Sequence, residues 1–140
     1  METADTARGV SGGAAALSSG PRPLLDTEIS LSPGQGADLD SSNAAAVKAV
    51  GPDGPIDIYF GAGLIRVNGG DLFYSSSQAL PTAEGCQTTL EHSPHTAEAS
   101  ASPASQYCFV TSKRRVAWMR INDEHSSPTG TVVVLTLRVW

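Results

Sequence analysis

Aromatic and charged side chains are both scarce in this chain of 140 residues, at 6% and 16% of the sequence. A chain of this composition favours short strands and turns over long helices. Glycine (14 residues) and proline (9 residues) are plentiful instead, and they divide a chain into short strands and turns. A chain of this length holds a single core, so the composition favours one small β domain.

The chain also lacks an excess of basic residues and any long apolar run. Its formal net charge of −5 argues against nucleic-acid binding, which normally uses a basic face. The one dense basic run, Lys113–Arg115, is typical of a solvated turn. No run approaches the roughly 18 apolar residues of a membrane span, and the start METADTARGV does not resemble a signal peptide.

Motifs of known catalytic chemistry are missing as well. The sequence has no G-x-S-x-G elbow and no P-loop, and GAG at 61–63 lacks the third glycine of a dinucleotide fingerprint. The spacing of Glu84, Glu91 and Glu98 selects no carboxylate pair for glycoside hydrolysis. The polar run NDEH at 122–125 is predicted to connect two strands. We therefore expect no enzyme and no cofactor; a small hydrolase or metal-dependent enzyme is the disfavoured alternative.

The chain is predicted to consist of a flexible leader and one folded domain. Residues 1–23 contain few large apolar side chains and end in Pro21 and Pro23, so they bury too little surface to fold. Residues 24–140 are predicted to form a single β domain. Apolar runs bounded by turn residues predict strands at 27–31, 37–40, 44–50, 56–60, 64–68, 71–74, 86–90, 106–111, 115–121 and 131–140.

The last third of the chain has the clearest strand pattern. Segment 115–121 is partly apolar on both faces, which is typical of a central strand covered on both sides. Residues 92–105 show no periodicity and are predicted to form a long mobile loop. About ten short strands at this spacing predict an all-β fold, either a β-sandwich or a partly open β-barrel of short antiparallel strands. One face of the final strand is predicted to point into the core: Val133, Leu135, Leu137 and Val139.

Only two cysteines occur, Cys86 and Cys108. An even number in a small domain rich in Gly and Ser favours a disulfide, and with it an extracytoplasmic location. Closing a loop of this length stabilises a fold by about 3 kcal/mol. A pair of reduced, buried thiols is the alternative. A zinc site that adds His92 and His95 to the cysteines is disfavoured, because nothing orients the imidazoles.

An oxygen-rich calcium site is a further alternative. It would use the carboxylates of Asp38, Asp40, Asp53 and Asp57. The spacing of an EF-hand loop with its closing glutamate is missing, however. The sequence therefore predicts no resident metal.

Ligand binding is the class of function that these exclusions leave. Exposed aromatic rings on a sheet can stack on a sugar or on an apolar group, so the candidate ligand-binding residues are Tyr59, Tyr74, Trp118 and Trp140. Each of them could instead pack in the core. The loop 92–105 is a second candidate surface. An exposed final strand could also pair edge to edge with a second copy and form a homodimer.

A resemblance covers residues 25–140. It is carried by DLD after a Pro-Gly turn (33–40), DIYF, Cys86 ahead of a His-Ser pair, YCFVTSKRRVAWMRI and a closing strand that ends in VW. The pattern resembles a small domain of bacterial secreted proteins, also found at the extracytoplasmic ends of membrane-anchored proteins that include some serine/threonine kinases. Its best-matching fragment is Cys-x-x-Thr at 108–111. A glycine is expected in the turn before Arg115, where this chain has Lys113-Arg114.

The resemblance implies neither an enzymatic activity nor a ligand. Together with the sequence features, it predicts a non-catalytic extracytoplasmic binding or sensory domain that recognises a protein partner or a small ligand. In the sensory form, residues 1–23 would tether the domain to an anchor or a kinase. A secreted carbohydrate-binding module is the alternative.

Overall fold

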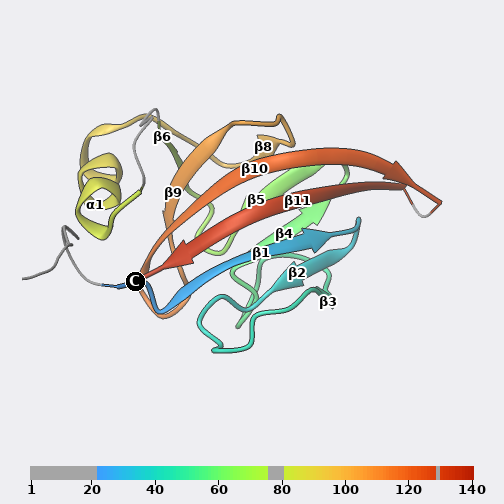
Figure 1. Cartoon of the computed structure of the whole chain (residues 1–140), viewed down its shortest axis with the longest axis horizontal. Helices are drawn as coiled ribbons and strands as arrows, with labels where there is room; N and C mark the ends of the chain where they lie inside the picture. The colour runs from blue at the N-terminus through green and yellow to red at the C-terminus, as the bar shows by residue number, and fades with distance from the viewer. Residues whose placement is uncertain (1–21, 76–80, 129) are drawn as a thin grey trace, which may run out of the picture.

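The computed structural model describes residues 22–75, 81–128 and 130–140. Almost all of the predicted leader, residues 1–23, lies outside the described residues. The described chain forms two antiparallel β-sheets packed against each other, with one short helix beside one end (Figure 1). The predicted all-β, two-sheet architecture is confirmed, and the sheets do not close into a barrel.

The larger sheet has six strands in the order β1-β11-β10-β9-β6-β7. The final strand lies between β1 and β10 and pairs with both, so the expectation that it forms an exposed edge is wrong. The edges of this sheet are β1 and β7, and a homodimer through a strand edge stays a prediction. The strands are β1 (Leu25–Leu31), β6 (Leu72–Ser75), β7 (His95–Thr96), β9 (Gln106–Val110), β10 (Val116–Ser127) and β11 (Gly130–Val139).

The smaller sheet has five strands in the order β3-β2-β4-β5-β8. Its members are β2 (Gln35–Ala37), β3 (Val47–Lys48), β4 (Ile58–Gly61), β5 (Leu64–Val67) and β8 (Ala99–Ser100). Because β7 belongs to the larger sheet and β8 to the smaller, segment 92–105 bridges the two sheets. The prediction of a mobile loop is wrong there: strands of two residues are too short to show a periodicity, and the small side chains of Ala99 and Ala101 are buried.

The core fills the space between the two sheets. The predicted face of β11 is fully buried, and alternate residues of β10, Ala117, Met119 and Ile121, lie beside it. The smaller sheet contributes large apolar side chains such as Phe60 and Ile65. The two-residue periodicity of the C-terminal strands therefore identified the core correctly.

A helix, α1 (Ala83–His92), takes the place of the strand predicted at 86–90. Thr82 caps its N-terminus, and the Thr82 hydroxyl accepts a hydrogen bond from the backbone N–H of Gly85 at 3.0 Å. Thr88 and Thr89 favour a strand by intrinsic propensity. In the helix their hydroxyls instead donate to backbone carbonyls one turn earlier. The strand prediction is wrong because the Thr82 cap and the packing of Cys86 and Leu90 against Trp118 and Cys108 override the β propensity of these threonines.

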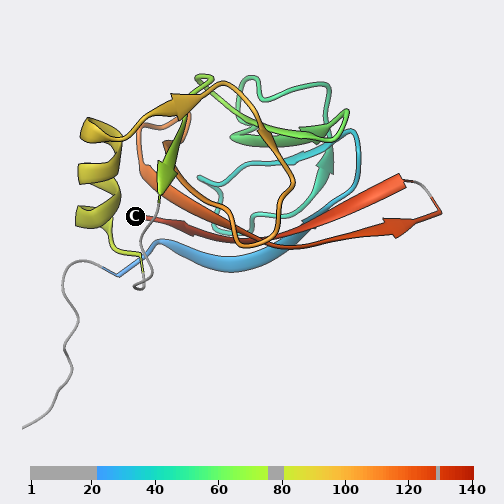
Figure 2. The ribbon, with the colours of Figure 1, turned by 90° about the horizontal axis from the view of Figure 1, so that it is seen from above.

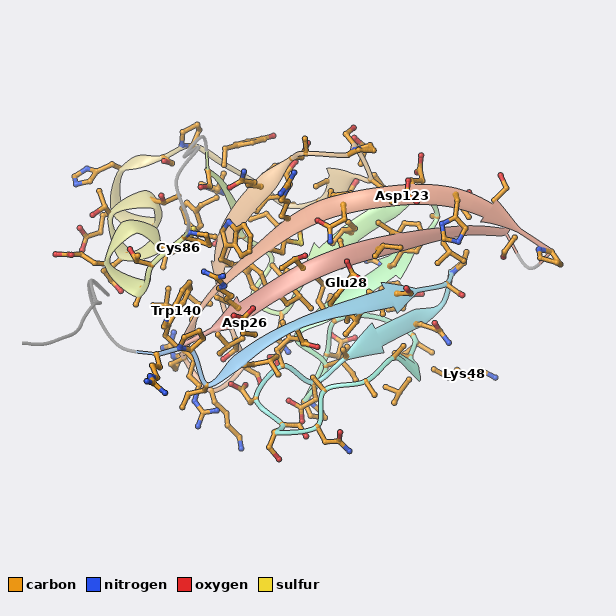
Figure 3. The ribbon with its side chains drawn as sticks, viewed as in Figure 1. Asp26, Glu28, Lys48, Cys86, Asp123 and Trp140 are labelled. Carbon is orange, nitrogen blue, oxygen red and sulfur yellow. A yellow bond between two sulfur atoms is a disulfide. The ribbon has the colours of Figure 1, made fainter. Side chains whose placement is uncertain are left out.

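The Cys86–Cys108 disulfide joins α1 to β9, as predicted, with 5.6 Å between the two Cα atoms. The bonded sulfurs pack with the buried Trp118 in a second small cluster, beneath α1 and on the outer face of the larger sheet. Figure 3 shows Cys86 and Trp140 on this side of the molecule. The strand at 115–121 is therefore covered on both faces at Val116 and Trp118, as expected, while Arg120 on the outer face is exposed. The disulfide suggests an oxidising compartment.

The β10–β11 hairpin extends past the rest of the sandwich (Figure 2). The run 122–125, predicted to connect two strands, is part of β10. That strand pairs with β11 as far as Ser127. The prediction is wrong because a strand that leaves the body of the domain faces water on both sides and needs no apolar alternation. The register shifts at Asn122. Nowhere in the described ranges does a helix have the length and apolar character to traverse a bilayer.

Candidate functional site

Three of the four aspartates considered for a calcium site lie together. One carboxylate oxygen from each of Asp38, Asp40 and Asp57 lies within 4.8 Å of the other two, and Asp53 is not part of this group. The three residues come from the segment after β2 and from the segment just before β4. Whether this cluster suits a cation depends on what its oxygens already contact.

Asp57 is fully buried and connects three separate segments. Its Oδ1 accepts the backbone N–H of Ser112 at 2.6 Å, and its Oδ2 accepts that of Leu39 at 2.7 Å. Its backbone carbonyl accepts the N–H of Asn68 at 2.9 Å. Burial raises the pKa of the Asp57 carboxyl, and the nearby Asp40 raises it further, while the hydrogen bonds from Ser112 and Leu39 oppose the rise.

Asp40 binds the turn between β9 and β10. Its Oδ1 accepts the Thr111 hydroxyl at 2.8 Å, and its Oδ2 accepts the Ser112 hydroxyl at 3.2 Å and the Lys113 N–H at 3.1 Å. The guanidinium of Arg115 lies 3.5 Å from Oδ1. Because protein donors occupy these oxygens, we treat Asp40 and Asp57 as a clamp on the turn and assign no metal to them.

A groove of about 400 Å³ lies beside the clamped turn. Phe73 lies opposite Cys108 across the β6–β9 pairing, so Phe73 and Val110 share one face of the larger sheet and form an apolar floor. The turn between β5 and β6 forms one wall, and the turn between β9 and β10 forms the other. The residues of the walls are Asn68, Gly69 and Asp71 on one side and Thr111, Ser112 and Arg114 on the other.

Both walls of this groove are hydrogen-bonded to Asp57. Ser112 is bonded through its N–H to the Asp57 side chain, and Asn68 is bonded through its N–H to the Asp57 carbonyl. The Asn68 side chain is also tied down, since its amide nitrogen donates to the carbonyls of Gly54 (2.9 Å) and Ile56 (3.1 Å). The walls are therefore held in place before any ligand arrives, which lowers the entropy lost on binding.

The polar groups of the groove differ between its walls. On one side, the Asp71 carboxylate lies 3.2 Å from Nδ1 of His95, whose ring packs on Phe73 with 5.1 Å between ring centroids. On the other side, Arg114 has a backbone φ of +67°, in the left-handed region that glycine adopts most easily. A cation, a carboxylate and an amide thus surround an apolar floor, an arrangement suited to an amphipathic small molecule.

The four predicted aromatic residues lie outside this groove. Tyr59 and Trp118 are only 9% and 5% exposed, and both rings are already engaged: Arg66 lies over Tyr59, and the Trp118 indole N–H donates to Gln106 at 3.3 Å. Trp140 is half-buried beside Trp118, on the cluster around the disulfide. Tyr74 is the most accessible of the four at 46%, and its ring contacts Tyr107.

Phe73 and Arg114 were missed as candidates from the sequence. Phe73 immediately precedes Tyr74 and points to the opposite face of the same strand. The signal for Arg114 was present, because glycine was expected in this turn and the backbone there has the conformation that favours glycine.

The disulfide overturns two alternatives. Cys86 and Cys108 are bonded to each other, so they are neither free thiols nor thiolate ligands for zinc. Of the histidines in that proposed site, His95 contacts Phe73 and Asp71. His92 lies at the end of α1 with a largely exposed side chain.

Comparison of the chain with protein-family profiles, with curated proteins and with solved structures gave no significant match.

Proposed function

We propose that this protein is a non-catalytic binding domain of an extracytoplasmic compartment, and that it binds a small ligand in the groove between the β5–β6 and β9–β10 turns. The observation that carries this proposal is the common anchorage of both walls on Asp57. A groove with an apolar floor and a few polar groups on fixed walls has the general form of a small-molecule site. A groove with a volume of about 400 Å³ suits a small ligand better than a protein partner.

The proposed compartment is supported by the disulfide. Cys86 and Cys108 are both almost completely buried, and the bond fastens α1, which has no other buried residue, to the sheet. Disulfides of this kind persist in oxidising environments. The sequence resemblance to extracytoplasmic bacterial domains supports the same compartment.

Ligand binding in the groove can be tested by filling the groove with a larger side chain. Val110→Phe places a larger side chain on the groove floor, and Val132→Phe makes the same change at a half-buried valine on the β10–β11 hairpin, away from the groove. Ligand-observed NMR with a panel of soluble glycans and small metabolites would identify binders to the oxidised wild-type protein. We expect Val110→Phe to abolish binding and Val132→Phe to preserve it. A panel in which every binder tolerates Val110→Phe would contradict the proposal.

A further inference from the structure

Arg114 keeps a large side chain at a position where the backbone favours glycine. Its φ of +67° lies in the left-handed region, which side chains other than Asn and Asp rarely adopt. Unfavourable backbone conformations of this kind are concentrated at binding and catalytic sites, where a particular side chain is needed. Arg114 also lines the groove described above.

The guanidinium of Arg114 has no protein partner in the described part of the chain. Two other arginines show the contrast: Arg115 is paired with Asp40 at 3.5 Å, and Arg138 with Asp26 at 3.3 Å. An unpaired guanidinium beside an apolar floor is suited to an anionic group of the ligand. Its planar fork of donors matches a carboxylate with two parallel hydrogen bonds.

The opposite wall presents acceptors. One oxygen of the Asp71 carboxylate lies 3.2 Å from Nδ1 of His95, and the other can accept from a ligand hydroxyl. The Asn68 oxygen can accept as well, because the amide nitrogen is directed at two carbonyls. A carboxylate on this wall also disfavours a multiply charged phosphate or sulfate more than a singly charged group, since like charges repel at short range. The ligand is therefore expected to carry one negative charge and several hydroxyls.

We propose that the groove binds an acidic saccharide, a sugar that carries a carboxylate. This inference rests on the proposed function of the groove and names its ligand class. The ring of Phe73 stacks on the C–H face of the sugar, Asp71 and Asn68 accept from its hydroxyls, and Arg114 pairs with its carboxylate. The volume of about 400 Å³ lies within the range of small-molecule sites.

The test compares acidic sugars with their neutral counterparts on matched variants. The probes are di- and trisaccharides that contain glucuronate or galacturonate, and the same oligosaccharides with glucose or galactose in place of the uronate. Arg114→Gly removes the guanidinium and suits the backbone, so the variant should fold. Lys113→Gly removes the neighbouring positive charge, which does not line the groove. Dissociation constants would be measured by isothermal titration calorimetry at low salt.

We expect at least one acidic oligosaccharide to bind about tenfold or more tightly than its neutral counterpart, the ratio typical of one charge-assisted bond. Arg114→Gly should remove this preference, and Lys113→Gly should preserve it. Equal binding of acidic and neutral sugars, or a preference that survives Arg114→Gly, would overturn the ligand class. If no acidic sugar binds but other ligands sensitive to Val110→Phe do, the ligand class is wrong and the proposed function stands. If no ligand is sensitive to Val110→Phe, both are wrong.

Discussion

The Oδ1 atom of Asp57 accepts the backbone N–H of Ser112 at 2.6 Å, across 55 residues of sequence. Asp57 lies just before a strand of the smaller sheet, and Ser112 lies in a turn of the larger sheet. This contact joins the two sheets at one end of the domain and sets the position of one wall of the groove. The same residue holds the other wall through the N–H of Asn68. The candidate site therefore depends on a buried polar residue rather than on its own lining.

Asp57→Asn is expected to lower the free energy of unfolding by about 1 to 3 kcal/mol, the cost of leaving buried donors unsatisfied. An amide has one accepting oxygen, so its nitrogen would face either the Ser112 or the Leu39 N–H. Asp53→Asn is the matched control, because Asp53 is exposed. Its unfolding free energy should stay within about 0.5 kcal/mol of wild type. Urea unfolding gives both free energies. If the two substitutions lowered the free energy of unfolding by similar amounts, Asp57 would not hold the turn in place.

The raised pKa of Asp57 predicts a pH dependence with a defined sign. The folded protein holds the Asp57 proton to higher pH than the unfolded chain, whose value is near 3.8. The contribution of Asp57 to stability should therefore fall as the pH rises from about 3.8 through the folded pKa, and then level off. The measurement is the difference in unfolding free energy between wild type and Asp57→Asn, followed from pH 3 to pH 7. A difference that increases with pH over this range would show that the folded pKa is lowered instead.

Loss of the disulfide should destabilise the domain without affecting the rest of the core. The double variant Cys86→Ser, Cys108→Ser opens a loop with a sequence separation of 22 residues, and we expect about 3 kcal/mol of lost stability on the chain-entropy account. Tryptophan fluorescence, which comes from Trp118 and Trp140 in the cluster around the disulfide, should also shift toward that of an exposed indole. Reduced wild type provides the control and should behave like the variant. A melting temperature unchanged from the oxidised wild type would rule out a stabilising role.

Arg114→Gly should leave stability unchanged or increase it by up to about 1 kcal/mol, because it relieves a left-handed backbone conformation. Lys113, one residue earlier, does not have a positive φ, so Lys113→Gly is the comparison. That substitution should lower stability by about 0.5 to 1 kcal/mol, since glycine adds freedom to the unfolded chain without relieving any strain. Thermal unfolding of the two variants side by side tests this. Greater loss in Arg114→Gly than in Lys113→Gly would mean that the arginine itself stabilises the fold.

The parts of the fold that could be predicted from the sequence are those with regular local patterns. The alternation of apolar residues in β11 identified its core face, and the presence of two cysteines predicted the disulfide. Segment 83–92 was misread because its threonines favour strands, and the capping role of Thr82 depends on a single residue. β7 and β8 were missed because two-residue strands form only when their partners are in place.

The candidate site was harder to predict because its parts are far apart in the sequence. Asp40 and Asp57 were considered together, but as calcium ligands; their bonds to the turn at 111–113 could not be foreseen from spacing. The groove forms only when that turn lies beside the one at 68–71. The one local signal was the missing glycine before Arg115, and its meaning required the backbone angle of Arg114.

Backbone amide shift mapping on ¹⁵N-labelled oxidised protein, titrated with the tightest-binding sugar of the panel, would show most directly whether the groove is the ligand site. We expect saturable shifts at the amides of both turns and of the floor between them: Gly69, Phe73, Ser112 and Arg114. Shifts confined to the β10–β11 hairpin or to α1, with these four amides unmoved, would contradict it.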